Sequence, residues 1–510
     1  MIFALITCAG PVEEHEARGS DSVDEGVALA ARYCVQCHGM PNPRQLPKQA
    51  WPELFAAMNV NARRWPDEGT HEAKAHAGHQ SWDETANKIM LNYFIRNALS
   101  ERRVRKSLRK PSATVLTDAQ FQPTPLTIPP AQFLTMLDYD PKRREIYYGL
   151  GRTVIEKDEL KIVPGNALLI MNQSWKILST TEFPNAPIHI EFERNSFRLT
   201  LIGEMGKDIG KSEVINVAFT ESGLVETRLL TDLTRAVGSR MRDFDGDGYA
   251  DILVSGFGGN GGSGELTIYW GKEDGKSFTA QVIFPGSGSL DAEVADFDGD
   301  GTIDILVLVT QQSQQLRLYL NRGERRFEER ILIQRPIGWG YMDLEVVDFD
   351  MDGDLDVVTI AGNNMEFGMP PLKPYHGIRI WINDGEGSLS EKFFYPLYGA
   401  AQCVIADVDG DGDLDIAVTA FTPDWEAEPP ETFVLLVQTS PLTLQPYHPP
   451  RSSWRRWTFL AKGDRQENGA TRLFVAHSWL PFGAPKNLRS SFEKDLELPG
   501  RVYSLDFTAP

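Results

Sequence analysis

The segment Asp243-Phe244-Asp245-Gly246-Asp247-Gly248-Tyr249-Ala250-Asp251, followed by the apolar run Ile252-Leu253-Val254, is the clearest copy of a repeat in this chain. Close copies begin at Asp296, Asp348 and Asp407, at spacings of 53, 52 and 59 residues. More degenerate copies begin at Asp138, Glu191 and Asp464. A sequence period of about 50 residues is typical of a repeat architecture.

Each repeat predicts a strand, a turn and further strands. Alternating apolar runs such as Leu266–Trp270, Leu316–Asn321 and Ile378–Asn383 follow the aspartate segments, and glycine-containing turns separate them. Short strands at this spacing are typical of a β-propeller blade. The seven starts therefore predict a mainly β chain with a seven-bladed propeller over residues 131–510. Val502–Phe507 reads as one more opening strand, which would complete the first blade or belong to an eighth blade.

These repeats resemble the FG-GAP/VCBS family, which is known from integrin α-chain propellers and many exported bacterial proteins. The resemblance covers roughly residues 130–508 and is carried by the D-x-D-G-D-G-x-x-D cores.

The same loops predict calcium sites. Calcium takes six to eight hard oxygen ligands, and carboxylates at loop positions 1, 3, 5 and 9 with the carbonyl of position 7 would supply them. Glycine at position 6 permits the sharp turn (Gly248, Gly301, Gly353 and Gly412), and Met351 replaces a glycine at position 4, which donates no side chain. The predicted ligands are Asp243, Asp245, Asp247, Asp251, Asp296, Asp298, Asp300, Asp304, Asp348, Asp350, Asp352, Asp356, Asp407, Asp409, Asp411 and Asp415.

We expect about four calcium ions with a structural role, each fixing the turn between two strands. The alternative is that aspartate and glycine only build Asx-turns. Magnesium fits less well, because it prefers fewer protein ligands and more water. The degenerate loops, which carry Arg194, Gln466 or Asn468, are expected to bind no ion.

A second motif, Cys34-Val35-Gln36-Cys37-His38, is the attachment signature of a c-type haem. The two thiols would each bond to one porphyrin vinyl group, and His38 would be the proximal iron ligand. A redox dithiol would need a surrounding βαβ pattern, and a zinc site would need a second ligand pair; the sequence has neither. The motif therefore predicts one covalent haem c.

The residues around this motif predict two helices. The pattern over 23–37 is amphipathic, and Ser81-Trp82-Asp83-Glu84 reads as a capping box before the stripe Ala86, Ile89, Met90, Tyr93 and Phe94. Together these segments resemble a small class I cytochrome c. The resemblance implies that the two helices cross at Gly26 and Tyr93.

A six-coordinate haem needs a distal ligand. Met40 is too close to His38 along the chain to reach the other face of the macrocycle, and Met90 is expected to lie in the core. Met58, on a short helix that starts near Trp51-Pro52, is the candidate, with His71, His76 and His79 as alternatives. Histidine–methionine ligation suits electron transfer.

Composition and the N-terminus bear on location. The net charge of −20 argues against a nucleic-acid partner, and no apolar stretch is long enough for a transmembrane helix. Leu5-Ile6-Thr7-Cys8 resembles a bacterial lipobox, which makes Cys8 a lipidation candidate and membrane association through a lipid an expectation. We therefore expect an exported, periplasmic or cell-envelope lipoprotein. Cys403 lies in an apolar run and is expected to be a buried small hydrophobe.

The chain thus divides into a signal remnant and tether (1–20), a small all-α cytochrome c-like domain (21–100), a basic and proline-rich linker (101–130) and the propeller (131–510). The arginines and lysines of 101–110 read as a solvated helix end and linker, or else as a docking surface for an acidic electron partner.

Three functions are compatible with these parts. The first is electron transfer to an unidentified redox protein, with the propeller as a calcium-stabilised scaffold or docking module. The second is an oxidoreductase that passes electrons from the propeller to its own haem, although the sequence lacks a cofactor fingerprint and the glycine-rich stretch 256–264 leads into a strand. The third is a glycan- or protein-binding module that uses the inserts 362–377 and 422–431. No catalytic residue is predicted, and the protein is expected to be an electron carrier rather than an enzyme.

Overall fold

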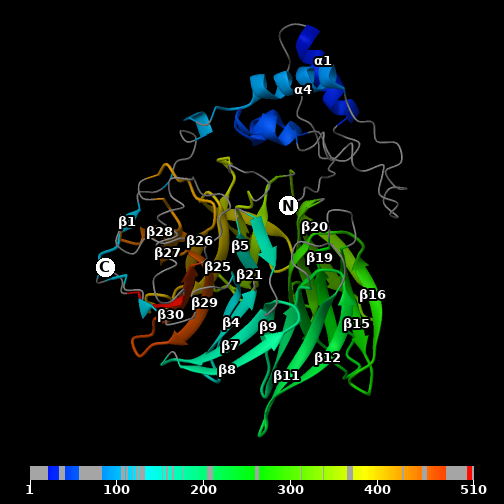
Figure 1. Cartoon of the computed structure of the whole chain (residues 1–510), viewed down its shortest axis with the longest axis vertical. Helices are drawn as coiled ribbons and strands as arrows, with labels where there is room; N and C mark the ends of the chain where they lie inside the picture. Colours follow the sequence, from blue (N-terminus) through cyan, green and yellow to red (C-terminus); the bar gives the residue numbers. More distant parts are fainter. Residues whose placement is uncertain are drawn as a thin grey trace.

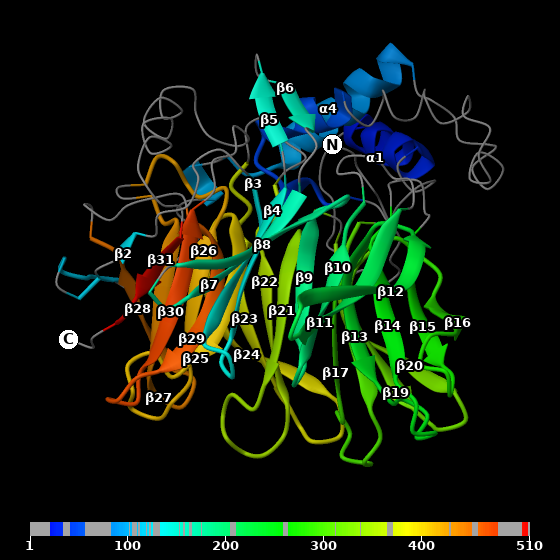
Figure 2. The ribbon, with the colours of Figure 1, turned by 60° about the horizontal axis from the view of Figure 1, so that its bottom comes forward.

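The structure is a computed structural model of the 510-residue chain. It describes residues 21–33, 41–56, 83–100, 102–104, 110, 113–118, 120–121, 124–125, 133–151, 153–156, 159–162, 166–174, 176–203, 211–258, 264–311, 313–336, 338–364, 371–427, 430–450, 457–477 and 502–507. A small helical part lies over one end of a ring of twisted β-sheets (Figures 1 and 2). None of the helices among these residues has the length and apolar character needed to span a membrane.

The ring contains seven blades, which confirms the predicted count and excludes the eight-bladed alternative within the described residues. The strands of blades 1 to 4, in chain order, are β3 (Phe133–Asp140), β4 (Glu145–Gly151), β7 (Asn166–Asn172) and β8 (Ile177–Phe183); β9 (Pro187–Phe192), β10 (Ser196–Leu201), β11 (Ser212–Thr220) and β12 (Gly223–Leu233); β13 (Ala236–Arg242), β14 (Asp251–Gly256), β15 (Glu265–Gly271) and β16 (Phe278–Phe284); and β17 (Ser289–Ala295), β18 (Asp304–Val309), β19 (Gln314–Asn321) and β20 (Phe327–Arg335).

Blades 5 to 7 complete the ring. Their strands are β21 (Tyr341–Val347), β22 (Asp356–Ala361), β23 (Gly377–Asn383) and β24 (Leu389–Pro396); β25 (Ala400–Ala406), β26 (Asp415–Ala420), β27 (Phe433–Ser440) and β28 (Thr443–His448), with β1 (Thr114–Val115) added at the edge; and β29 (Trp457–Arg465), β30 (Thr471–His477), β31 (Val502–Leu505) and β2 (Thr124–Pro125). A separate hairpin, β5 (Thr153–Glu156) and β6 (Glu159–Ile162), extends from blade 1.

Packing between neighbouring blades explains the strand sequences. The innermost strands β3, β9, β13, β17, β21, β25 and β29 contact one another in ring order, and β29 also contacts β3. Every residue of β14, β18, β22 and β26 is buried, because each second strand is covered on both faces by adjacent blades. These strands are therefore mostly apolar after a single aspartate, with small polar residues at Ser255, Thr359 and Thr419.

The ring closes differently from the sequence prediction. Val502–Leu505 is not an opening strand of blade 1 or of an eighth blade; it is β31, the third strand of blade 7, antiparallel to β30. The outermost strand of that blade is β2, which comes from before the first blade and pairs with β31. The segment expected to be a linker thus contributes edge strands to blades 6 and 7.

The helical part contains α1 (Asp21–Tyr33), the short 3-10 helix η2 (Pro43–Gln45), a helical stretch over 50–56 and α4 (Glu84–Asn97). Asp83 caps α4 by accepting a hydrogen bond from Ala86 N at 2.7 Å, so the cap lies two residues beyond the Ser81 that the predicted capping box used. Ala86, Met90 and Phe94 form the buried face of α4, which confirms Met90 as a core residue.

Candidate metal sites at the aspartate loops

The four strong aspartate loops lie between the first and second strand of a blade, as the repeat predicted, whereas the three degenerate segments begin within the first strand of their blades. In the four strong loops, positions 4 and 6 have positive φ angles: 74° and 88° at Gly246 and Gly248, and 61° and 101° at Met351 and Gly353. A side chain at such an angle is strained, which explains glycine at seven of these eight positions and makes Met351 the exception.

Each strong loop brings three of its four predicted carboxylates together. The grouped residues are Asp243, Asp245 and Asp251; Asp296, Asp298 and Asp300; Asp348, Asp350 and Asp356; and Asp407, Asp409 and Asp415. Within each group, one oxygen per residue lies within 4.8 Å of the others. Calcium–oxygen bonds of about 2.3–2.6 Å allow two ligands of one ion to stand about 5 Å apart, so each group fits one coordination sphere.

The remaining predicted ligands lie outside these groups. Asp247, Asp352 and Asp411 at position 5 accept hydrogen bonds from the backbone N–H of position 7 at 2.9–3.0 Å. Asp304, at position 9 of the second strong loop, is also outside its group. The aspartates at position 5 therefore do form Asx-turns. A carboxylate that accepts one such hydrogen bond still has an oxygen that can bind a cation.

The aspartate at position 9 has a second role that the sequence reasoning missed. Asp251 accepts from Phe244 N at 2.9 Å and from Gly271 N at 2.8 Å, which joins the loop to the end of the third strand. Asp304, Asp356 and Asp415 make the equivalent pair of bonds. All four are fully buried at the first position of a second strand. Position 9 therefore anchors the blade whether or not an ion is bound.

Two asparagines also hold the loops from the neighbouring blade. Asn321 Nδ2 donates to Phe244 O at 2.7 Å, and Asn383 Nδ2 donates to Phe297 O at 3.4 Å. Each asparagine ends a third strand, so it reaches the aspartate loop of the preceding blade. The signal was visible in the sequence, because asparagine ends both apolar runs at Leu316–Asn321 and Ile378–Asn383.

The electrostatics of the loops favour a cation. Burial, followed by repulsion from the loop carboxylates, raises the pKa of Asp304 to about 6 and that of Asp415 to about 7. Burial also raises the pKa values of Asp251 and Asp356. A nearby divalent ion would offset this cost by stabilising the ionised carboxylates.

Some loop oxygens have no hydrogen-bond donor. Asp298 Oδ1, Asp348 Oδ1 and Asp350 Oδ1 are buried and lack a partner among the residues that the structure describes. Buried carboxylate oxygens normally accept hydrogen bonds or bind metal. These three oxygens therefore fit the ligands of an ion.

The haem residues Cys34, Cys37 and His38, the candidate distal ligand Met58, the alternative histidines and Cys8 lie outside the described residues. The helices beside the motif are described, and they approach where the resemblance implied: a Cβ on Gly26 would lie 2.5 Å from Tyr93 Cβ. Cys403 is fully buried, as predicted.

Aromatic side chains fill the core of the helical part. The rings of Trp51 and Phe94 lie 4.4 Å apart, and those of Phe55 and Phe94 lie 5.3 Å apart, centroid to centroid. Trp51 Nε1 donates to Pro43 O at 3.0 Å, which ties the 50–56 helix to η2.

The helical part is attached to blades 5 and 6. Val104 is buried against Leu372 and Tyr398, and Leu99 packs on the same cluster. Lys110 forms an ion pair with Glu431, and its ammonium group lies 5.6 Å from the centre of the Tyr398 ring. Both inserts noted in the sequence thus contribute contacts to the segment that follows α4.

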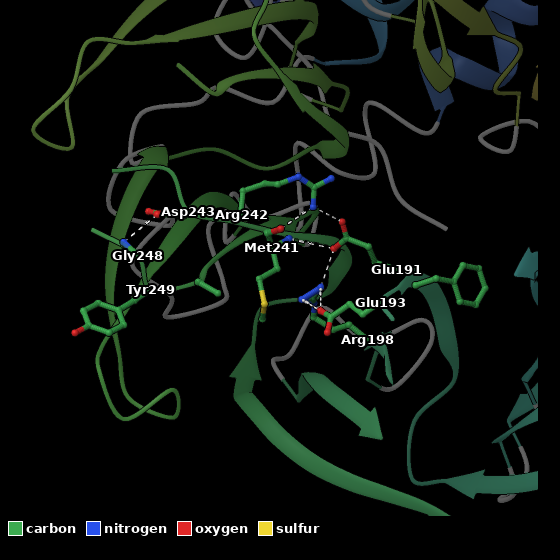
Figure 3. Close-up of a pocket in the computed structure, with 10 residues that line it drawn as sticks. Glu191, Glu193, Arg198, Met241, Arg242, Asp243, Gly248 and Tyr249 are labelled. Carbon is green, nitrogen blue, oxygen red and sulfur yellow. Dashed lines mark hydrogen bonds and ion pairs between the residues drawn. The ribbon is translucent and has the colours of Figure 1, made fainter. Parts of the chain in front are cut away.

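One open pocket, of about 280 Å³, lies between blades 2 and 3 (Figure 3). It is lined on one side by Glu191, Glu193 and Arg198 of blade 2 and on the other by Arg242 and Asp243 of blade 3. Four of its lining residues, Glu191, Glu193, Arg198 and Arg242, form ion pairs with one another.

Comparison with known proteins shows which repeat family these segments match. The model of the FG-GAP-like repeat matches residues 243–307, 296–359 and 372–418, which include the four strong loops. No curated protein matches the chain. Two solved structures are similar at 10% sequence identity: the N-terminal domain of Nup159 (TM-score 0.42, covering 78% of this chain and 100% of that one) and Saccharomyces cerevisiae Sqt1 (TM-score 0.40, covering 72% and 83%). The loop chemistry, the blade count and the repeat match agree: this chain contains FG-GAP-like repeats that fold as a seven-bladed β-propeller.

Proposed function

We propose that this protein is an exported c-type cytochrome that transfers electrons, with the FG-GAP-repeat propeller as its calcium-stabilised base. The observation that carries the proposal is the position of Cys34-Val35-Gln36-Cys37-His38 directly after α1. That helix packs on α4 at the Gly26–Tyr93 contact, the arrangement that the resemblance to cytochrome c implies.

In this proposal Cys34 and Cys37 hold the porphyrin covalently, His38 is the proximal ligand and Met58 is the distal ligand. The haem supplies reversible one-electron transfer when bound. The described residues would provide an apolar environment, because Trp51, Phe55 and Phe94 are buried in one cluster with Ala30 of α1. Such an environment limits water access and so helps to set the reduction potential.

The propeller would bind four calcium ions, one at each strong loop. The close carboxylate groups and the three buried oxygens without donors support this assignment. The ions would act structurally by joining the first and second strands of blades 3 to 6. We expect the degenerate loops of the other three blades to bind no ion.

The contacts of Val104, Lys110 and Glu431 favour a docking role for the propeller over a glycan-binding role for its inserts. The described parts of both inserts already contact the chain's own segment 99–110. We infer that the propeller positions the haem domain for a redox partner protein outside the cytoplasm.

A spectrum tests the haem. The full chain, expressed with its own or a supplied export signal in a host that matures c-type cytochromes, should give a pyridine haemochrome with the bands of thioether-linked haem. The Cys34→Ala/Cys37→Ala variant, with the propeller intact, is the matched control and should be colourless. A colourless wild-type protein would remove the electron-transfer function.

The same preparation tests the oxidoreductase function and the distal ligand. Rapid haem reduction by a sugar or alcohol without an added protein would show an oxidoreductase.

Conversion of Met58 to Ala should change the axial-ligand spectrum and lower the reduction potential, whereas an unchanged spectrum would exclude Met58 as the distal ligand.

A further inference from the structure

Blade 2 contains a buried cation of the chain itself, on the strand that follows its degenerate loop. Arg198 lies directly opposite Glu191 in the β9–β10 pairing, and its side chain is only 2% exposed. Arg198 Nη2 is 3.0 Å from Glu191 Oε2 and 2.9 Å from Glu193 Oε1 (Figure 3). In the sequence repeat Glu191 and Glu193 align with the aspartates of positions 1 and 3; in the structure Glu191 lies within β9, and Glu193 directly follows that strand.

The guanidinium group therefore contacts two carboxylates that align, in the sequence repeat, with proposed calcium ligands of the strong loops. Its planar set of N–H donors matches carboxylate oxygens well. Glu191 is also held by blade 3, through Met241 N at 3.1 Å and Arg242 Nη1 at 2.6 Å. The ion pair thus joins the first two strands of blade 2, which is the structural role that we propose for calcium in the strong loops. It also connects blade 2 to blade 3.

Burial distinguishes Arg198 from the arginines near the strong loops. Arg322 and Arg325 also contact loop aspartates, but their side chains are 34% and 41% exposed. An exposed arginine can move into solvent when an ion arrives. Arg198 projects from the middle of β10 and is only 2% exposed, although it lines the pocket between blades 2 and 3, so it would have to break its ion pairs and repack to reach solvent.

Blade 7 has an ion pair at a similar place in the repeat, but its arginine is exposed. Asp464, near the end of β29, accepts from Arg144 Nε at 2.8 Å; Arg144 belongs to blade 1, and its side chain is 63% exposed. Tyr139 and Gln173 also donate to Asp464. The blades without a strong loop are consecutive around the ring: 7, 1 and 2.

We propose that Arg198 is a permanent internal cation that replaces calcium in blade 2, so that calcium removal loosens blades 3 to 6 and leaves blade 2 folded. The part about blades 3 to 6 rests on the proposed calcium function. The part about Arg198 does not.

Hydrogen exchange followed by mass spectrometry tests both parts on the full chain, in calcium chloride and in EGTA. In EGTA, amides within 236–448 should exchange at least about tenfold faster, whereas amides within 187–233 should change by less than about twofold. Equal loss of protection in 187–233 would overturn the proposal. Unchanged exchange in 236–448 would contradict the calcium function alone.

The Arg198→Gln variant then tests the internal cation in EGTA. Amides of residues 187–201 should lose protection, because Glu191 and Glu193 would repel each other without a counter-charge. Arg228→Gln is the control, since Arg228 pairs with Glu213 in the same blade but is 59% exposed. Unchanged protection in Arg198→Gln would overturn the assignment.

A triple variant, Glu191→Gln/Glu193→Gln/Arg198→Gln, removes all three charges and should regain protection of these amides. Failure to regain it would show that Arg198 acts through packing rather than charge.

Discussion

Arg322 Nη1 lies 3.0 Å from Asp298 Oδ2 in the loop of blade 4, and 3.1 Å from Asp300 Oδ2. The arginine comes from the turn between β19 and β20 of the same blade. It therefore places a positive charge beside two of the three carboxylates that we assign to calcium in that loop. A guanidinium group and a calcium ion repel each other and compete for the same oxygens.

Replacing this arginine should tighten calcium binding at blade 4. In Arg322→Gln the dissociation constant of that site should fall by about tenfold or more, because a unit charge at roughly 5 Å from a divalent ion costs about 1.7 kcal/mol even at the dielectric constant of bulk water. Calorimetric titration measures it. Arg326→Gln is the control, because Arg326 pairs with Glu324 and is 69% exposed. Weaker binding in Arg322→Gln would mean that the arginine supports the site.

Met351 should be a point of strain. Its φ angle is 61°, in the left-handed region, and its side chain is 55% exposed, so it gains little from packing. Met351→Gly should stabilise blade 5 by about 1 kcal/mol, since glycine adopts this angle without a steric penalty. Thermal unfolding in calcium measures the change. Met351→Ala keeps a Cβ and should stabilise little; equal gains in both variants would point to a cause other than the backbone angle.

The aspartates at position 9 should matter more than those at position 5. In Asp415→Asn one of the two buried backbone N–H groups, of Val408 or Gln438, would face an amide NH₂ instead of an oxygen. We expect a loss of about 2–3 kcal/mol in the free energy of unfolding, even in EGTA. Asp411→Asn should cost little in EGTA, because Asp411 bonds only within the exposed turn. Chemical denaturation compares the two; equal losses would contradict the anchoring role.

The sequence predicted the repeating part of this fold well and its closure poorly. Asp243 to Asp251 and its copies are local signals, because turn geometry and the following buried strand depend on adjacent residues. The pairing of Val502–Leu505 with β30 and β2 is set by which edge is open in the finished ring, and its apolar pattern matches that of an opening strand equally well. The roles of Arg198 and Arg144 were also hidden, because their partners are identified only when strands and blades are placed side by side.

Acidification should weaken calcium binding. The pKa values of about 6 for Asp304 and about 7 for Asp415 are above the value of about 4 for an unfolded aspartate. A raised folded-state pKa means that the calcium-free folded protein binds these protons more tightly than the unfolded chain does. Stability in EGTA should therefore gain from these groups as the pH falls from about 7 towards 4.

In calcium the same protons compete with the ion, so the dissociation constants should increase over this pH range. The measurement is the difference in unfolding temperature between calcium and EGTA at pH 7.5 and at pH 5.5, which cancels titrations unrelated to the loops. We expect the difference to shrink at the lower pH. A difference that stays constant or grows would show that the buried aspartates remain ionised.

The contact between α1 and α4 should tolerate only glycine. Gly26 is buried, and an added Cβ would lie 2.5 Å from Tyr93 Cβ and 3.5 Å from Ile89 O, so Gly26→Val would push the helices apart. Overpacking of this kind costs about 1–3 kcal/mol, which is a large fraction of the free energy of unfolding of a small helical domain.

Because Cys34 follows α1 directly, the same change should reduce the haem content per protein while leaving the calcium-dependent melting of the propeller unchanged. Ala28→Val, on the exposed face of α1, is the matched control and should retain haem. Full haem content in Gly26→Val would show that the helix crossing is not needed to hold the attachment motif.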